Sequence, residues 1–276
     1  MKYTFPALAF FFLLVSPRAA EPVETGFIIA PAYLPPGRFT KSMKGFRSSL
    51  DPFRPGVTRA ENFDSMLNRE FWLRVGDLFG PRHWIGFSVG DYISENFAVQ
   101  EARTDPSYID TDWSFKFSYF SLNYDFRDKL SRKWSWEGHV ALGFLTLAQW
   151  RVNGVRANSA GPQRYDSVHL ARFGNLWRLG LGLHRVLGKH LILRTGLRAT
   201  YFYFGDFRGR ENRLDSQWYY TRDGGLIQLT PLDVEEIILT RNTAAGDVPD
   251  KLLFLREKAY PRFGALELYL SLGLRF

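Results

Sequence analysis

The chain alternates apolar residues with polar or small residues in eight segments, and this period of two constrains its fold more than any other feature. Successive side chains of a β-strand point to opposite faces, so the alternation predicts strands with two different surfaces. The last segment is the clearest, with leucine at every second position from Leu266 to Leu274 and then Phe276. The eight predicted strands are residues 25–34, 69–78, 83–92, 113–126, 134–152, 168–186, 191–207 and 263–276.

One predicted strand changes its apolar parity part-way along. Within residues 113–126, aromatic rings occupy odd positions up to Tyr119, and apolar residues occupy even positions from Phe120 onward. One extra residue in a strand turns its faces over. We therefore predict a β-bulge near Tyr119 and Phe120.

The connections between the strands predict a barrel. Residues 79–82, 127–133 and 187–190 are short turns, whereas the other connections are long. Short turns at one end and long loops at the other, on an even number of strands, are typical of a transmembrane β-barrel. The sequence thus predicts an all-β fold, an eight-stranded antiparallel up-and-down transmembrane barrel. It forms one domain over residues 21–276, with long extracellular loops at 35–67 and 208–262.

The segment before residue 21 predicts export. Its apolar run, residues 5–15, is the longest in the chain at 11 residues, against the roughly 20 that a membrane-spanning helix needs. Lys2 precedes this run and Ala19 and Ala20 follow it, as in a secretory signal. We expect residues 1–20 to be a signal peptide.

The polar face distinguishes a membrane barrel from a soluble barrel, which would turn its apolar face inward. That face carries many glycines, such as Gly86, Gly180 and Gly182, which weaken a water-facing strand but make room for long side chains inside a narrow barrel. We therefore place the polar parity in the lumen. The predicted lumen network is Glu70, Arg74, Lys116, Glu137, His139, Arg178, Arg194, Arg198, Glu267 and Arg275.

Aromatic residues gather near the strand ends and predict two girdles at the membrane interfaces. The turn-side girdle would hold Tyr124, Phe126, Trp134, Trp136 and Phe276. The loop-side girdle would hold Trp113, Phe115, Trp150, Tyr201 and Tyr203.

The final strand, LELYLSLGLRF, resembles the targeting signal of bacterial outer-membrane proteins. The mature chain as a whole resembles small OmpA- or OmpX-type barrels with larger loops. The resemblance implies a Gram-negative outer membrane as the location. It also implies that the outer-membrane assembly machinery reads Leu272, Leu274 and Phe276.

The interior of an eight-stranded barrel is just wide enough for side chains to fill. The mixed charges therefore favour an internal plug, and a narrow channel for small solutes is the alternative. An outer-membrane lipid-modifying enzyme is a further alternative, but Ser135, Glu137 and His139 repeat every ~6.5 Å along one strand face, too far apart for a nucleophile–base hydrogen bond. We expect no catalytic residue, metal or cofactor.

The loops favour a structural or surface-binding role. Residues 35–67 hold six basic and three acidic side chains, and Arg38, Lys41, Lys44 and Arg47 are candidates for binding anions. Outer-membrane lipid, including lipopolysaccharide, is the expected partner; nucleic acid is not expected, and the chain should be a monomer.

The long loop 208–262 is expected to carry structure of its own. Residues 217–221 and 226–229 flank a glycine-containing turn and predict a hairpin, and Pro231 with the acids after it predicts a helix over 231–241. If the hairpin joins the sheet of the barrel, the barrel has ten strands instead of eight.

Overall fold

The computed structural model describes residues 22–42, 46–47, 56–60, 63–77, 79–94, 97–103, 108–158, 161–171, 173–211, 214–221, 226–231 and 255–276. The expected signal peptide, residues 1–20, lies outside this part of the chain. Within the described residues, no helix has the length and apolar character needed to cross a membrane.

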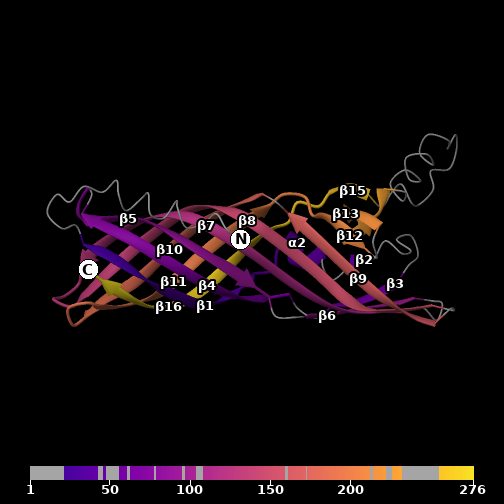
Figure 1. Ribbon diagram of the computed structural model, residues 1–276, viewed down its shortest axis with the longest axis horizontal. Coiled ribbons are helices and arrows are strands. Elements are labelled where there is room, and N and C mark those ends of the chain that lie inside the picture. The colour runs from indigo at the N-terminus through magenta and orange to yellow at the C-terminus, as the bar shows by residue number, and fades with distance from the viewer. Residues whose placement is uncertain are drawn as a thin grey trace.

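Eight antiparallel strands close into a barrel, which confirms the predicted fold (Figure 1). Around the barrel, each strand pairs with the next, and the pairing of β16 with β1 brings the first and last strands together. The eight strands, in chain order, are β1 (Val23–Tyr33), β4 (Ser65–Asp77), β5 (Gly80–Ile93), β7 (Tyr108–Lys129), β8 (Trp134–Asn158), β10 (Gly174–Leu187), β11 (Leu191–Phe204) and β16 (Arg262–Arg275).

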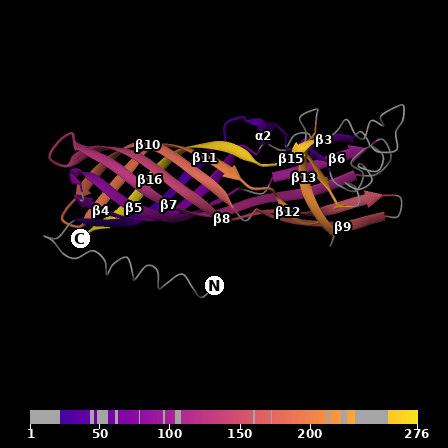
Figure 2. The same cartoon turned by 90° about the horizontal axis from the view of Figure 1, so that it is seen from above.

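The sheet continues past the barrel at the long-loop end (Figure 2). β7 and β8 are 22 and 25 residues long and extend beyond the neighbouring barrel strands, β5 and β10. On β7 the extension adds β6 (Phe97–Arg103) and β3 (Gly56–Ala60). On β8 it adds β9 (Gly161–Ala171), β12 (Arg208–Glu211), β13 (Leu214–Thr221), β14 (Leu226–Leu229), β15 (Leu255–Lys258) and the two-residue β2 (Phe46–Arg47). We call these strands, together with the ends of β7 and β8, the extension.

Two predictions about this region need correction. Residues 168–186 form the end of β9 and most of β10 instead of one strand, because β9 pairs with the part of β8 that lies beyond the barrel. The hairpin of 217–221 with 226–229 is confirmed by the pairing of β13 with β14. Its strands join the extension and not the barrel, so the ten-stranded alternative is wrong. After Pro231, the helix expected over 231–241 lies outside the described residues.

The bulge lies on β8 and not on β7. Ser118 pairs with Leu147 while the next residue, Tyr119, pairs with Leu145, so Thr146 has no partner in the ladder. On β7 the odd positions face inward throughout, from buried Trp113 to buried Arg127. The apolar residues move from odd to even positions because the inward side chains of β7 are aromatic near the long loops and polar near the short turns. In the sequence, this change of lining looks the same as a bulge.

Glycines on the inward parity make room for long side chains, as predicted. A Cβ atom on Gly182 would lie 2.2 Å from the Tyr269 hydroxyl and 2.8 Å from the Thr195 carbonyl oxygen. A Cβ on Gly86 would lie 2.8 Å from Cγ of Arg74. The narrow lumen therefore depends on residues without side chains opposite its arginines and tyrosines.

Replacing Gly182 with alanine should destabilise the barrel, because overpacking a filled interior costs about 1–3 kcal/mol. Gly138→Ala is the matched control on an outward position, where the nearest atom, on Trp136, would be 3.7 Å from the new Cβ. The temperature at which the folded band converts to the unfolded band in gel electrophoresis measures both. Equal midpoints for the two variants would contradict the packed interior.

Candidate functional site

The half of the lumen nearer the short turns is lined by a balanced set of buried charges. Among the described residues, five arginines and five carboxylates point inward, and none of them exceeds 7% exposure. The arginines are Arg74, Arg127, Arg178, Arg194 and Arg198; the carboxylates are Glu24, Glu70, Asp125, Glu137 and Glu267. Because a buried charge is stable only when paired, each of these side chains needs partners inside the barrel.

One group of pairs centres on Glu137. Its carboxylate accepts hydrogen bonds from Arg194 Nε at 2.9 Å and from Arg127 Nη2 at 3.5 Å. Arg74 Nη1 lies 3.7 Å from the same carboxylate and 2.9 Å from Asp125 Oδ2. Three guanidinium groups from three strands thus share one glutamate.

The second group joins Glu70 to Glu267. Arg198 bridges them, with Nη1 3.0 Å from Glu70 Oε2 and Nη2 3.0 Å from Glu267 Oε2. Arg178 Nη1 donates to Glu70 at 2.8 Å, and the Tyr92 hydroxyl donates to Glu267 at 2.5 Å. This group ties β4, β5, β10, β11 and β16 across the lumen.

The buried histidines of the barrel complete the network. His139 Nδ1 lies 2.7 Å from Asp125 Oδ1, and His184 Nε2 lies 3.3 Å from Glu24 Oε1. Glu24 also accepts two bonds from Arg127, at 3.0 and 2.9 Å. Ser135 has no hydrogen bond to His139 within the described part of the chain, so the strand face carrying Ser135, Glu137 and His139 does not assemble as a nucleophile and base.

The structure places eight of the ten predicted lumen residues inside the barrel: Glu70, Arg74, Glu137, His139, Arg178, Arg194, Arg198 and Glu267. Lys116 is a correction. It faces outward, 53% exposed and 3.6 Å from Asp91 Oδ2, because the inward positions of β7 are the odd ones. Arg275 is also a correction, since it is half-buried at the rim of the short-turn end.

Several network residues are missing from the predicted set. Glu24 precedes the first predicted strand by one residue, and Arg127 falls in a predicted turn. Tyr92 and Tyr119 resemble apolar rings in the alternation, although each hydroxyl bonds a carboxylate, at 2.5 and 2.6 Å. Asp125 could have been included in the predicted set, because it lies between Tyr124 and Phe126 on the polar positions of the alternation.

The half of the lumen nearer the long loops is aromatic. Phe115 packs 4.7 Å from Trp150, and Phe117 packs 4.9 Å from Phe202, measured between ring centroids. Phe39, on the short helix α2 (Arg38–Ser42), stacks on Phe263 at 5.8 Å at the junction between the barrel and the extension. The fully buried rings of this layer include Phe39, Trp113, Phe115, Phe117, Trp150, Phe202, Phe204, Phe207 and Trp218.

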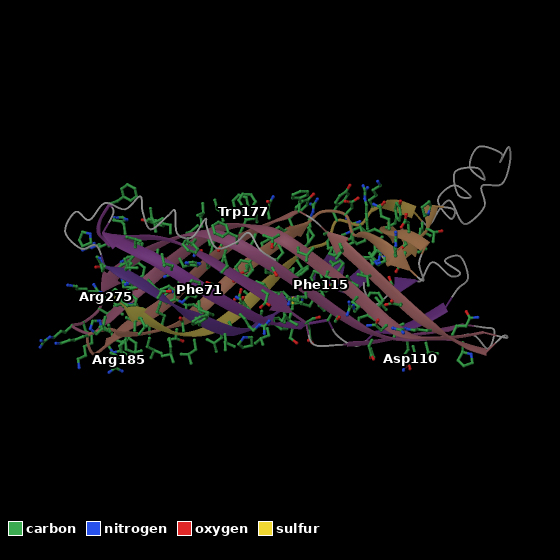
Figure 3. All side chains as sticks on the ribbon, in the orientation of Figure 1. Phe71, Asp110, Phe115, Trp177, Arg185 and Arg275 are labelled. Atoms are coloured by element: carbon green, nitrogen blue, oxygen red, sulfur yellow. The ribbon has the colours of Figure 1, made fainter. Side chains whose placement is uncertain are left out.

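This layer corrects the predicted loop-side girdle. Trp113, Phe115 and Trp150 are inside and fully buried, whereas Tyr201, 47% exposed, faces outward as predicted. Figure 3 shows Phe115 within the molecule and Trp177 on its outer surface. Trp177 and Phe173 are 58% and 82% exposed at the start of β10 and just before it, and both add apolar surface to the outside of the barrel.

A buried polar cluster sits in the extension beneath Trp218. His169 Nδ1 lies 3.0 Å from Ser167 Oγ, and His169 Nε2 lies 2.7 Å from Ser216 Oγ. Gln228 Nε2 donates to both hydroxyls at 3.2 Å. Burial lowers the pKa of His169 to about 3, while its hydrogen bond with Ser216 acts in the opposite direction. The imidazole is therefore neutral at physiological pH.

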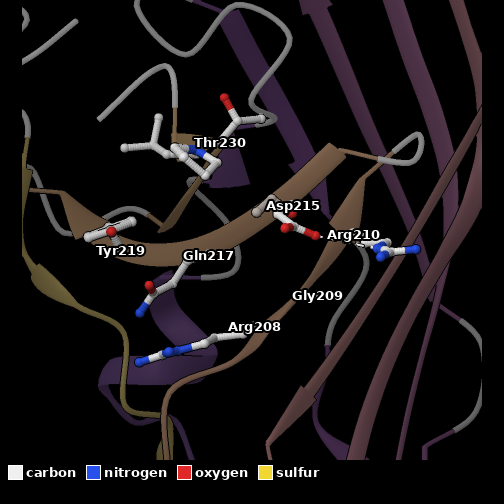
Figure 4. Close-up of a pocket in the computed structure, with 10 residues that line it drawn as sticks. Arg208, Gly209, Arg210, Asp215, Gln217, Tyr219 and Thr230 are labelled. Atoms are coloured by element: carbon white, nitrogen blue, oxygen red, sulfur yellow. Dashed lines mark hydrogen bonds and ion pairs between the residues drawn. The ribbon is translucent and has the colours of Figure 1, made fainter. Parts of the chain in front are cut away.

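The outer side of the extension carries a pocket of about 620 Å³ along β12 and β13 (Figure 4). Arg208 and Arg210 point away from each other along β12, and their side chains are 67% and 74% exposed. Arg208 Nε lies 2.6 Å from Asp206, which also accepts from Gln217 at 3.1 Å. The other lining residues include Asp215, Tyr219, Leu229, Thr230 and Pro231.

The four candidate anion-binding residues are spread over several elements. The Arg38 guanidinium lies 4.1 Å above the Tyr220 ring, and Lys41 is exposed in the last turn of α2. Arg47 belongs to β2, and Lys44 lies outside the described residues. Three other predicted site residues, Leu272, Leu274 and Phe276, are outward on the closing strand with 47–72% exposure.

No family model and no curated protein matches the chain. Among solved structures, a major outer membrane protein from Thermus thermophilus matches 93% of this chain and 100% of its own, with 12% identity and a TM-score of 0.48. Ail, the attachment invasion locus protein of Yersinia pestis, solved with the heparin analogue sucrose octasulfate, matches 92% of this chain and 99% of its own, with 10% identity and a TM-score of 0.32. The closed eight-stranded barrel of the present chain, defined by its own strand pairing, agrees with the architecture that its sequence resembles.

Removing the Glu137 carboxylate should strongly destabilise the barrel, because Arg194, Arg127 and Arg74 would lose a shared partner. Breaking a buried ion pair costs about 3–5 kcal/mol. Asp91→Asn is the control, since its pair with the exposed Arg69 should contribute about 1 kcal/mol or less. Urea unfolding in detergent micelles measures both, and a Glu137→Ala variant as stable as the control would contradict the shared pairing.

Acid should loosen the extension through His169. Between pH 6.5 and 3 the unfolded chain binds a proton on this imidazole that the folded chain does not. The free energy of unfolding therefore falls as the pH falls through that window. From pH 7 to 5.5 we expect a loss of about 1 kcal/mol.

Amide hydrogen exchange of β9 and β13, corrected for intrinsic rates, measures this loss. A His169→Asn variant should lack it, whereas His190→Asn, in an exposed turn, should retain it. The same acid dependence in His169→Asn as in the wild type would assign the effect to other groups.

Proposed function

We propose that the chain is a non-conducting outer-membrane barrel of the surface-binding type. Its lumen is plugged by the charge network and the aromatic layer, and its extension presents the binding surface outside the cell. The observation that carries the proposal is that the barrel has a polar inside and an apolar outside, the reverse of a soluble barrel. Charged side chains pair inside it, and leucines cover its outer surface. The short-turn end then faces the periplasm.

The outer surface supports membrane insertion. On β16 five outward leucines are 47–61% exposed, and Leu179, Leu181 and Leu197 on the adjoining strands are 63–67% exposed. A continuous apolar surface of this kind is unfavourable in water and is typical of contact with lipid. The expected signal peptide at residues 1–20 and the outward Leu272, Leu274 and Phe276 agree with export and with recognition by the assembly machinery.

The interior supports a closed lumen. Opening a path would break pairs such as Arg198 with Glu70 and Glu267, and would leave their charges without partners. Above this layer the packed rings would also have to separate. Both changes are costly, the first by several kcal/mol for each uncompensated charge.

The pocket on the extension supports binding of anionic groups. Arg208 and Arg210 are exposed, and each pairs through Nε with an aspartate, Asp206 and Asp215 respectively. The two Nη groups of each guanidinium remain to bind a phosphate or sulfate with parallel hydrogen bonds. Burial raises the pKa of Tyr219, so its hydroxyl remains a hydrogen-bond donor. Lipopolysaccharide phosphates, or an acidic polymer at the cell surface, fit this chemistry, and a monomer suffices to form the pocket.

Planar bilayer recordings test the plug. The wild-type protein should add no ion conductance, because the lumen offers no hydrated path, and Glu137→Ala should remain closed although less stable. A porin reconstituted in the same membrane is the positive control. Steady conductance from the wild type would favour the narrow channel instead.

Titration with lipopolysaccharide tests the pocket. Neutralising Arg208 and Arg210 together, as Arg208→Gln with Arg210→Gln, should weaken binding roughly tenfold, since each exposed charge contributes up to about 1 kcal/mol. Arg164→Gln with Arg151→Gln removes two exposed charges elsewhere on the extension and is the control. If both pairs weaken binding equally, the pocket is not the site.

A further inference from the structure

The short-turn end of the barrel carries a group of six basic side chains, which we call the basic rim. Its members are Lys129, Arg132, Lys133, Arg185, Lys189 and Arg275. Four of them are exposed, while Arg185 and Arg275 are half-buried. Three of the six, Arg132, Lys133 and Lys189, are in two short turns, and the other three are on the strands β7, β10 and β16.

The turns of the basic rim are neighbours in space. The Val186 amide donates to the Lys133 carbonyl at 3.2 Å, which joins the β7–β8 turn to the end of β10. The Arg275 amide donates to the His190 carbonyl at 2.7 Å, which joins the β10–β11 turn to β16. Figure 3 shows Arg185 and Arg275 at the same end of the molecule. The six charges therefore form one surface along the rim.

Carboxylates do not neutralise this surface. Asp128 lies 3.4 Å from Arg82 Nε, and Glu24 is buried inside with Arg127. Among the described residues, no carboxylate forms an ion pair with any member of the basic rim. The rim is thus a concentrated positive patch.

Arg185 places one cation of the basic rim on the outside of the barrel wall. It occupies an outward position on β10, and its guanidinium lies 4.9 Å from the Trp134 ring centroid. Its Nε is buried and has no hydrogen-bond acceptor within the described residues. The guanidinium therefore lies on the outer surface of the barrel wall, beside the Trp134 ring.

The surface next to the basic rim is apolar. Leu183, Leu191 and Leu274 face outward beside it with 40–47% exposure. A row of cations at the edge of an apolar band is the position that lipid headgroups occupy along a membrane protein.

We infer that the basic rim binds the headgroups of anionic phospholipids, of the phosphatidylglycerol type, in the leaflet at the short-turn end. The inference rests on the membrane insertion proposed above. Arginine's planar fork suits a phosphate, and Arg185 would donate to it from its place against Trp134. Each basic side chain near an anionic lipid surface strengthens binding roughly fivefold at low salt.

The test uses the full chain reconstituted in lipid nanodiscs that contain equal amounts of dioleoyl phosphatidylglycerol and dioleoyl phosphatidylcholine. The two lipids share their acyl chains and differ in headgroup charge. Lipids that remain bound after extraction are counted by native mass spectrometry. The wild type should retain phosphatidylglycerol in roughly tenfold excess or more, and the excess should fall as salt is raised.

The variant Arg132→Gln, Lys133→Gln, Lys189→Gln should lose most of this excess. Its substitutions are in exposed turns, and the gel shift on heating checks that it folds. The control, Arg151→Gln, Arg164→Gln, Lys258→Gln, removes the same charge from exposed positions at the other end. The single variant Arg185→Gln should lose part of the phosphatidylglycerol excess.

Equal retention of the two lipids by the wild type overturns the inference. If the control variant loses as much of the phosphatidylglycerol excess as the rim variant, the preference comes from net charge alone and the inference is also overturned. Failure of the chain to insert into phosphatidylcholine bilayers overturns the proposed membrane function and this inference with it. Insertion without a headgroup preference overturns this inference only.

Discussion

The pairing of arginines with carboxylates inside the barrel is the interaction on which the rest of the structure depends. Five cations and five anions lie buried inside the barrel, so each charge is stable only while its partners stay in place. Arg198 and Glu137 connect most of the strands through these pairs. The leucines of the same strands face outward, because successive side chains of a strand point to opposite faces.

The aromatic layer connects the barrel to the extension. It gives the half of the lumen nearer the long loops an apolar core, on which the extension is built without disulfides. Trp150 and Trp218 pack 5.1 Å apart, so a barrel strand and the hairpin of the long loop share that core. The extension is therefore anchored to the aromatic interior of the barrel, and its pocket lies on a hydrogen-bonded sheet.

The number of barrel strands, their order and most of the lumen residues are predictable, because the period of two reports which side chains share a face. What the period does not report is which solvent each face meets. Rings such as Trp113 and Phe115 fit both a membrane interface and a packed core, so their sequence positions alone place them wrongly against lipid. The bulge at Thr146 is predicted on the wrong strand for the same reason, and the pairing of Glu24 with Arg127 joins residues 103 positions apart.

The long sequence separations within the charge network have a consequence for biogenesis. Arg198 and Glu70 are 128 residues apart, and Glu267 lies on the strand that closes the barrel against β1. These groups cannot neutralise one another until the first and last strands meet. A half-made barrel would hold hydrated charges that resist entry into lipid. For a barrel inserted in a membrane as proposed, closure, burial of these charges and insertion should therefore occur as a single cooperative event.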